Sequence, residues 1–188
     1  PMFPIVLPFG FIPDRPDRAT GILFPTFGEE ASRGFYLRDL GMYFVIGDYF
    51  DIAVTGDIYT LGSWALDLNS RYKVNYKFNG SFSLTYSNDQ TGERGSSDFF
   101  QTKNFAVRWN HSQDSKARPG TTFSASVNFS SPSNNKYNAT SVTEALQNQI
   151  SSSISYSKNW NGKLNLSVNA LHNQNSKDSS YSFTLPNV

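Results

Sequence analysis

The feature that most constrains the fold of this chain is an alternation of apolar and polar residues with a period of two. It is clearest in TTFSASVNFSS, residues 121–131, where serine and asparagine separate four apolar residues, Phe123, Ala125, Val127 and Phe129. Successive side chains of an extended strand point to opposite faces, so this segment has one apolar and one polar face. Either a soluble sheet buries the apolar face, or a membrane barrel turns that face to lipid and the polar face to its lumen.

Strand-like runs of this kind follow one another from residue 21 to the end of the chain. The alternation slips in phase around residues 40–41, which predicts a bulge or kink. Only residues 141–150 look helical, with Ser141 as N-cap and Glu144 at the capping-box spacing. The predicted strands are 21–25, 34–46, 51–60, 63–74, 81–88, 104–113, 121–131, 150–158, 163–172 and 181–185.

The composition suits a membrane barrel better than a soluble sheet. Charged residues make up 16% of the chain and aromatic residues 15%, and the chain contains 26 serines and 18 asparagines. Soluble β-proteins rely more on lysine and glutamate for solubility and for protection of their edges. The net charge of +1 gives no reason to expect a nucleic-acid partner. There is no cysteine, and no apolar run is long enough for a transmembrane helix.

The connections between the predicted strands alternate between longer and shorter segments, with one exception at 61–63. Alternate connections of an up-and-down meander emerge at the same end, so this pattern puts long loops at one end and short turns at the other, as in outer-membrane barrels. The longer connections are 26–33, 89–103, 132–149 and 173–180, and the shorter ones are 47–50, 75–80, 115–120 and 159–162.

Aromatic residues gather near both ends of the predicted strands, which is typical of the girdles at membrane interfaces. The chain is therefore predicted to be all-β: an antiparallel up-and-down meander of about ten strands from a transmembrane β-barrel. Two alternatives remain: a complete small outer-membrane barrel acting as a porin, an adhesin or an enzyme, and a soluble β-sandwich that binds a ligand. The girdle residues are Tyr49, Phe50, Tyr76, Phe78 and Trp160 at the short-turn end, and Tyr59, Trp64, Phe99, Phe100 and Tyr181 at the other.

The alternation assigns individual side chains to the two faces of the barrel wall. Paired carboxylates could carry out acid–base chemistry, but a hydrated lumen is the natural place for charges that would be costly in lipid. Among the lumen residues, Arg71 and Arg108 suit a phosphate group. The predicted lumen-lining residues are Asp51, Asp57, Asp67, Arg71 and Arg108, and the predicted lipid-facing residues are Val54, Leu66, Leu84, Val127 and Leu166.

Motifs for catalysis or for a cofactor are weak. Asn110, His111 and Ser112 contain the residue types of an outer-membrane esterase, but neighbours on a strand point to opposite faces, so His111 does not orient Ser112. The acidic loop 87–98 lacks the ordered spacing of a calcium site. No enzymatic activity, metal or other cofactor is expected.

Four stretches resemble the LptD (OstA-type) lipopolysaccharide-assembly proteins in the form found in Bacteroidetes: LPFGFIP, GILFPTFGEEASRGFYLRD, GDIYTLGSWALDLNSRYKVNYKFNGSF and WNHSQDSKARPGTTFSASVNFS. Members of that family carry a periplasmic jelly-roll domain followed by a large barrel in the bacterial outer membrane, plugged by a lipoprotein. The resemblance implies that residues 1–20 are a proline-rich segment at the end of the jelly roll. Residues 21–188 would then be the first strands of a larger barrel.

The resemblance also implies a function without bond chemistry: lipopolysaccharide leaves sideways through the barrel wall at a weak seam between the first and last strands. Proline cannot donate to a strand ladder and so weakens such a seam. Prolines also mark ordinary linkers, so their presence alone does not decide between the two interpretations. The candidate residues of the lateral gate are Pro8, Pro13 and Pro25.

Overall fold

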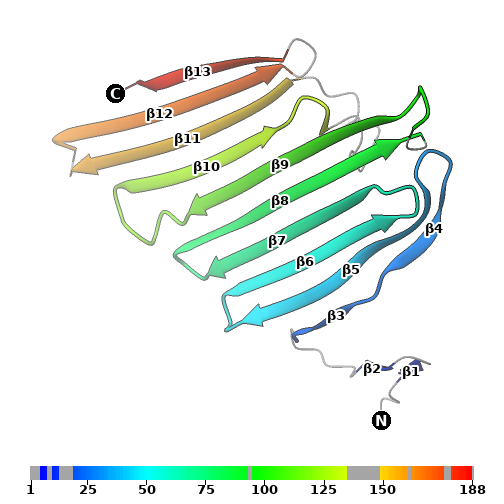
Figure 1. The fold of residues 1–188 in the computed structure, drawn as a ribbon. Helices are drawn as coiled ribbons and strands as arrows, with labels where there is room; N and C mark the ends of the chain where they lie inside the picture. The colour runs from blue at the N-terminus through cyan, green and yellow to red at the C-terminus, as the bar shows by residue number, and fades with distance from the viewer. Residues whose placement is uncertain are drawn as a thin grey trace.

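One antiparallel sheet of eleven strands makes up most of the part of the chain that the structure describes (Figure 1). The computed structural model describes residues 5–7, 10–12, 19–92, 95–134, 149–160, 162–175 and 179–187. The strands are β1 (Ile5–Leu7), β2 (Gly10–Ile12), β3 (Gly21–Leu23), β4 (Thr26–Glu30), β5 (Gly34–Ile46), β6 (Phe50–Tyr59), β7 (Trp64–Val74), β8 (Phe78–Thr91), β9 (Phe100–Gln113), β10 (Thr121–Ser130), β11 (Gln149–Trp160), β12 (Leu164–Asn175) and β13 (Ser180–Asn187).

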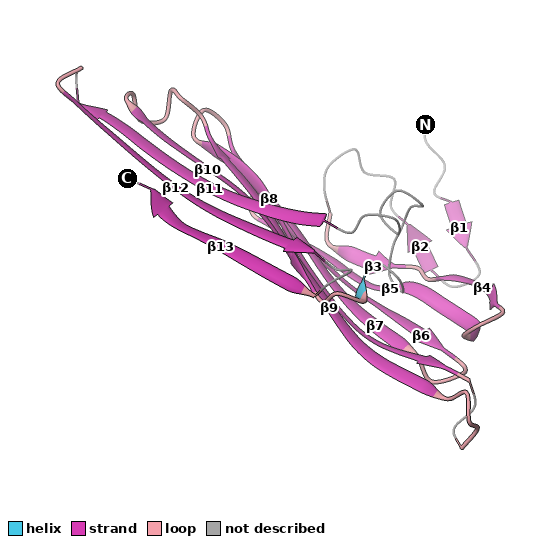
Figure 2. Cartoon of the chain, turned by 90° about the horizontal axis from the view of Figure 1, so that it is seen from above, coloured by secondary structure: helices cyan, strands magenta, loops and turns pink. Residues whose placement is uncertain are grey.

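Each strand from β5 to β13 pairs with its neighbour in sequence, so the main sheet is an up-and-down meander. This confirms the predicted all-β meander. The described strands of the main sheet form a single twisted layer (Figure 2), which rules out a β-sandwich for them. The sheet is not closed, because β13 lies at one edge and β3 and β4 lie at the other. β1 and β2 pair in a separate two-stranded sheet.

The strands from β5 to β12 contain 10–14 residues each. A barrel strand needs about 9–11 residues to cross the hydrocarbon of a bilayer, so these strands are long enough. Most extend beyond the predicted bounds; the run predicted at 81–88, for example, is the centre of β8. The predicted helix at 141–150 falls mainly outside the described residues. At its end the prediction is wrong, because Gln149 and Ile150 belong to β11 and pair with β12.

The first hairpin differs from the sequence prediction. Residues 26–33, predicted to be a long connection, contain β4 and a tight turn, because backbone pairing with β5 resumes at Thr26↔Arg38. β3 pairs with the other half of β5. Pro25 therefore interrupts one edge of the sheet instead of ending the first strand.

β5 contains the predicted irregularity. Its pairing with β6 shifts register between Leu37 and Leu40, and Asp39 has a φ of 63°. The Asp57 carboxylate of β6 accepts a hydrogen bond from the Asp39 backbone N–H at 2.9 Å and so supports the bulge. The phase slip in the sequence is thus a bulge at residues 38–39, and it restores the apolar residues of β5 to one face.

The predicted asymmetry of the loops is only partly right. The connections from β8 to β9 and from β10 to β11 are long, and both emerge at the same end of the sheet. At that end, however, residues 31–33 form a tight turn where a long connection was predicted, and residues 60–63 are the short exception noted in the sequence. These turns are closed by backbone hydrogen bonds between residues close in sequence, such as Gly62 N–H to the Tyr59 carbonyl at 3.1 Å. The strands on either side are therefore joined directly, without a long loop.

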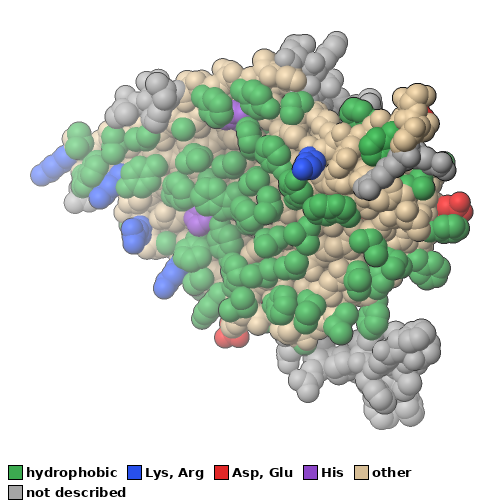
Figure 3. Space-filling model, viewed as in Figure 1, with side chains coloured by type: hydrophobic (Ala, Val, Ile, Leu, Met, Phe, Trp, Pro, Cys, Tyr) green, Lys and Arg blue, Asp and Glu red, His purple; other side chains and the backbone are tan. Residues whose placement is uncertain are grey.

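Burial in this sheet is the reverse of that in a soluble protein. The largest fully buried side chains include Gln174 and Asn104, both polar. Many large apolar side chains are exposed instead, among them Leu66, Met42 and Phe183. Hydrophobic side chains cover the face seen in Figure 3. Such an extended apolar surface on a single sheet marks a face that contacts something other than water.

Gly41 gives a test of the packing between β5 and β6. A Cβ atom at Gly41 would lie 2.0 Å from the Val54 carbonyl oxygen, whereas one at Gly56 would meet nothing closer than 3.6 Å. We expect Gly41→Ala to lower the free energy of unfolding by about 1–3 kcal/mol, because the two strands must move apart. Gly56→Ala is the matched control and should be close to neutral. Urea unfolding of the full-length protein in lipid vesicles measures both, and equal losses would contradict this packing.

Candidate functional site

The apolar face of the sheet is continuous across its strands. The pairing registers place Val54, Leu68, Leu84, Val107 and Phe129 in one row across five strands, from β6 to β10. The five residues predicted to face lipid all lie on this face, which we call the apolar wall. They are Val54, Leu66, Leu84, Val127 and Leu166.

The opposite face, called the polar wall below, carries the five residues predicted to line a lumen. Asp51 lies opposite Arg71 in the register of β6 and β7. Asp67 accepts a hydrogen bond from the Thr85 hydroxyl at 2.5 Å, and Arg108 lies opposite Asn128. Their side chains are interleaved with Ser, Thr and Asn residues, so the charges are surrounded by groups that can hydrogen-bond with them.

These charged residues do not converge on a single centre. Asp57, Asp67 and Arg108 line one hollow of about 570 Å³ together with Arg33 and Arg38. Another hollow, of about 790 Å³, is lined by residues that include Asp51, Arg71 and Lys73. The polar wall is therefore a surface with charges of both signs spread along it, which suits a path or a broad contact better than a reaction centre.

Asn110, His111 and Ser112 do not form an esterase site. His111 lies on the apolar wall, where its Nδ1 atom is hydrogen-bonded to the Tyr72 hydroxyl at 2.8 Å. The same hydroxyl accepts a bond from Trp109 Nε1 at 2.9 Å. Ser112 and Asn110 face the polar wall, as the alternation predicts. The polar atoms of these rings thus satisfy one another within the apolar wall.

Tyr59 does not belong to an aromatic girdle, contrary to the sequence prediction. It lies on the polar wall and is buried, because Arg38 donates a hydrogen bond to its hydroxyl at 2.7 Å and the Arg33 guanidinium lies 4.5 Å from its ring centroid. Other predicted girdle residues, such as Tyr49, Trp64 and Tyr181, are exposed.

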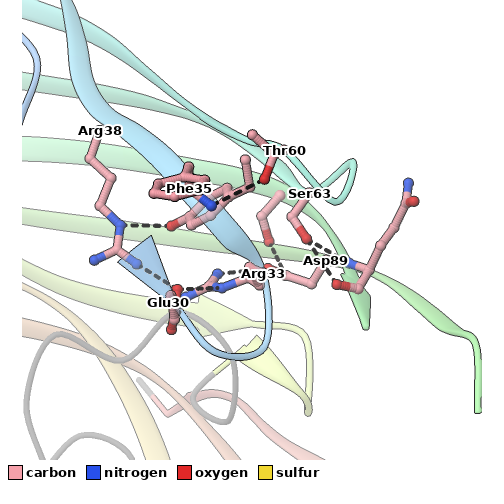
Figure 4. A network of polar contacts seen from close by, with 10 residues as sticks. Glu30, Arg33, Phe35, Arg38, Thr60, Ser63 and Asp89 are labelled. Carbon is pink, nitrogen blue, oxygen red and sulfur yellow. Dashed lines mark hydrogen bonds and ion pairs between the residues drawn. The ribbon is translucent and has the colours of Figure 1, made fainter. Parts of the chain in front are cut away.

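A network of ion pairs fixes the turn between β4 and β5 (Figure 4). Glu30 receives bonds from two arginines: Arg33 Nε at 2.9 Å and Arg38 Nη2 at 2.9 Å. Thr60 joins this turn to the next one, since its hydroxyl accepts a bond from the Phe35 N–H at 3.1 Å. We call this network the hairpin latch.

Asp89 connects the hairpin latch to the middle of the sheet. It is only 3% exposed, and its carboxylate accepts a bond from Arg33 Nη1 at 3.2 Å. Ser87 Oγ and Asn104 Nδ2 donate to its other oxygen at 2.6 and 2.8 Å. The edge hairpin is thereby tied to β8 and β9, several strands away. The sequence analysis missed Glu30, Arg33 and Asp89, which it placed in loops.

The part of the chain that the structure describes contains no helix that is long and apolar enough to cross a membrane. Within the same residues, no group of three or more His, Cys, Asp or Glu side chains is placed to hold a metal ion.

Comparison with known proteins agrees with the fold and the two-sided sheet. The family model described as LptD protein matches residues 1–188. The chain belongs to the LptD family. This family takes part in lipopolysaccharide transport and assembly in the outer membrane. No curated protein matches the chain.

The hairpin latch can be tested with Asp89→Asn. The neutral amide keeps the shape of Asp89 but removes the charge that pairs with Arg33. We expect a loss of about 1.5–3 kcal/mol in the free energy of unfolding, as for a hydrogen bond to a charged group. Asp98→Asn, in the exposed loop before β9, is the control and should have little effect. Urea unfolding of the full-length protein measures both variants. If Asp89→Asn left the free energy of unfolding unchanged, the hairpin latch would contribute nothing to stability.

Proposed function

We propose that this chain is part of an outer-membrane translocon that releases lipopolysaccharide sideways through its barrel wall, at the edge formed by β3 and β4. The observation that carries the proposal is an interrupted first edge on a sheet with one apolar and one polar wall. Membership in the LptD family is the reason for naming lipopolysaccharide as the substrate. No bond is made or broken; the protein provides a path.

The physical reason for a lateral exit at this edge is the state of its hydrogen bonds. An unsatisfied backbone N–H or C=O in hydrocarbon costs several kcal/mol, so a barrel wall normally stays closed. Pro25 has no N–H to donate, and it falls between the two segments that pair with β5. The register of those segments puts it beside the bulge at Asp39. The edge segment at Pro25 and the neighbouring strand β5 at Asp39 are therefore irregular at the same height in the sheet. Fewer backbone hydrogen bonds are lost if the wall parts there, which lowers the free-energy cost of opening.

The two walls match the two parts of a lipopolysaccharide molecule. In this proposal the acyl chains leave along the apolar wall, and the phosphorylated headgroup follows the charged residues of the polar wall. Arg71 and Arg108 are suited to phosphate because guanidinium groups bind it with two parallel hydrogen bonds.

The open edges imply partners. β3, β4 and β13 each expose one side of their backbone, and in a membrane they must pair with other strands. We assign this role to the remaining strands of a larger barrel, with residues 1–20 as the end of the preceding periplasmic domain. A plug lipoprotein would fill the lumen. Pro8 and Pro13 lie outside the described residues, so their part in the gate rests on the sequence alone.

The assignment of the two walls predicts opposite effects at neighbouring residues. Val127→Arg puts a charge on the apolar wall near the middle of β10, and we expect a loss of about 2–4 kcal/mol in the free energy of folding into bilayers. Ser126→Arg is the matched control, because it places the same side chain on the polar wall, and it should cost much less. Folding of the full-length protein into lipid vesicles measures both. Equal costs would contradict the proposal that one wall faces lipid.

The lateral exit predicts a response to changes at the first edge. Pro25→Ala restores a backbone donor, so in the full-length protein we expect a tighter seam and slower appearance of lipopolysaccharide at the cell surface. A disulfide between a cysteine at Leu23 and one in the closing strand should block delivery almost completely, and reduction should restore it. Surface labelling of newly made lipopolysaccharide is the measurement. Wild-type delivery in both variants, with a block from a crosslink elsewhere in the wall, would place the exit at another seam.

A further inference from the structure

Positive charge gathers at the short-turn end of the sheet. The described residues of the turns after β7, β9 and β11 include one acid, Asp114, against four cations, and Lys158 near the end of β11 adds a fifth. The four cations of the turns are Lys77, Lys116, Arg118 and Lys163. Lys and Arg side chains border the apolar face along this edge in Figure 3. None of the five cations forms an ion pair with a described residue, so this edge carries positive charge that the sheet does not neutralise.

Lys158 is the cation of this group that lies on the apolar wall. The registers place it opposite Thr121 of β10 and opposite Leu166, which belongs to the apolar wall of β12. Its Nζ atom lies 4.7 Å from the centroid of the Trp160 ring, which is two residues nearer to the turn. The side chain thus runs along the wall toward the turn. A lysine at a membrane interface takes this course, because its alkyl stem rests on apolar surface while its charge stays out of hydrocarbon.

Two turns bring further cations to the end of β11. On one side, the Asn159 N–H donates to the Gly120 carbonyl at 2.6 Å, which holds the turn that carries the exposed Arg118 beside this strand. On the other side, the turn to β12 is closed by the Lys163 N–H, which donates to the Trp160 carbonyl at 2.9 Å. The side chain of Lys163 is exposed as well. We call the resulting group the basic corner; it consists of Arg118, Lys158, Trp160 and Lys163.

We propose that the basic corner binds the phosphate of an anionic phospholipid in the leaflet at the short turns. Lysine and arginine donate charge-assisted hydrogen bonds to phosphate, and basic clusters beside a membrane recognise anionic lipids. Trp160 is exposed, and its amphipathic ring is typical of a membrane interface. The inference rests on the proposed function only in placing the apolar wall in a membrane.

The apolar side chains next to these cations favour a lipid over other sources of phosphate. Leu164 is 61% exposed, and it lies on the apolar wall with Leu166. A free phosphate ion would gain nothing from these leucines, whereas a phospholipid lays its acyl chains against them while its phosphate meets Lys158. Lipopolysaccharide also carries phosphate, but outer-membrane barrels turn their short connections to the periplasm, away from the cell surface.

The test titrates the purified full-length protein in detergent with phosphatidylglycerol, and native mass spectrometry counts the bound lipids and gives the Kd. The wild-type protein should bind this lipid several-fold more tightly than zwitterionic phosphatidylcholine. We expect Lys158→Gln to weaken the binding of phosphatidylglycerol by about fivefold, the effect of removing one cation near an anionic lipid, and Lys158→Arg to keep it. Lys103→Gln is the matched control, because Lys103 is exposed on the same wall at the loop end of β9, outside the basic corner. It should bind like wild type.

Three results would overturn the phospholipid site: equal affinity of the wild-type protein for the two lipids, equal binding by Lys158→Gln and Lys103→Gln, or displacement of phosphatidylglycerol by an equal amount of inorganic phosphate or lipopolysaccharide. Resistance to unfolding in detergent before heating checks that each variant is folded. Binding to the purified protein requires no transport, so its failure leaves the lateral exit untouched. Conversely, unimpaired delivery in the edge variants would overturn the exit and leave the phospholipid site standing.

Discussion

The requirement that every backbone N–H and C=O in hydrocarbon has a partner within the protein governs the whole architecture. The ladders from β5 to β12 run almost without a break because each strand completes the hydrogen bonds of the next. The few places where a ladder stops are therefore informative. They are the two outer edges, the level of Pro25 and Asp39, the end of β10 beyond Ser126, and the register shift between β12 and β13 at Asn169 and Leu171.

At two interior breaks, the bulge of β5 and the end of β10, side chains take over from the ladder. The Asp57 carboxylate accepts the Asp39 N–H at the bulge. At the end of β10, Ser152 Oγ donates to the Asn128 carbonyl at 2.7 Å and accepts from the Asn128 N–H at 2.8 Å. These contacts keep the backbone satisfied while the strands part. The proposed exit lies where backbone pairing gives way to side-chain contacts.

The first hairpin combines a weak ladder with a strong anchor. Near Pro25 the edge has lost backbone pairing, whereas at the turn Glu30, Arg33 and Asp89 hold it by buried and half-buried ion pairs. Breaking a buried pair leaves an uncompensated charge, so this anchor resists separation. An edge that is fixed at its turn and irregular at its middle is restricted in how it can part from a neighbouring strand. In the proposed exit, the edge would part near Pro25 while its turn stays tied to Asp89 of β8.

Sequence alone determined the strands, their faces and the bulge in β5, because these follow from a two-residue period that is written locally in the chain. The five apolar and five charged residues singled out by this period lie on opposite walls.

The two-residue period did not predict β4. Its sequence TFGEE carries a glycine and two glutamates, and it forms a strand because β5 lies beside it. Tyr59 was misplaced because its partners come from another strand and a turn. Tertiary structure alone decided the hairpin latch. Arg33 and Asp89 are 56 residues apart in the sequence, and they meet only because the strands from β4 to β8 pair in the observed registers. The rows of neutral side chains on β11, β12 and β13 likewise form only because the registers of the three strands bring them together.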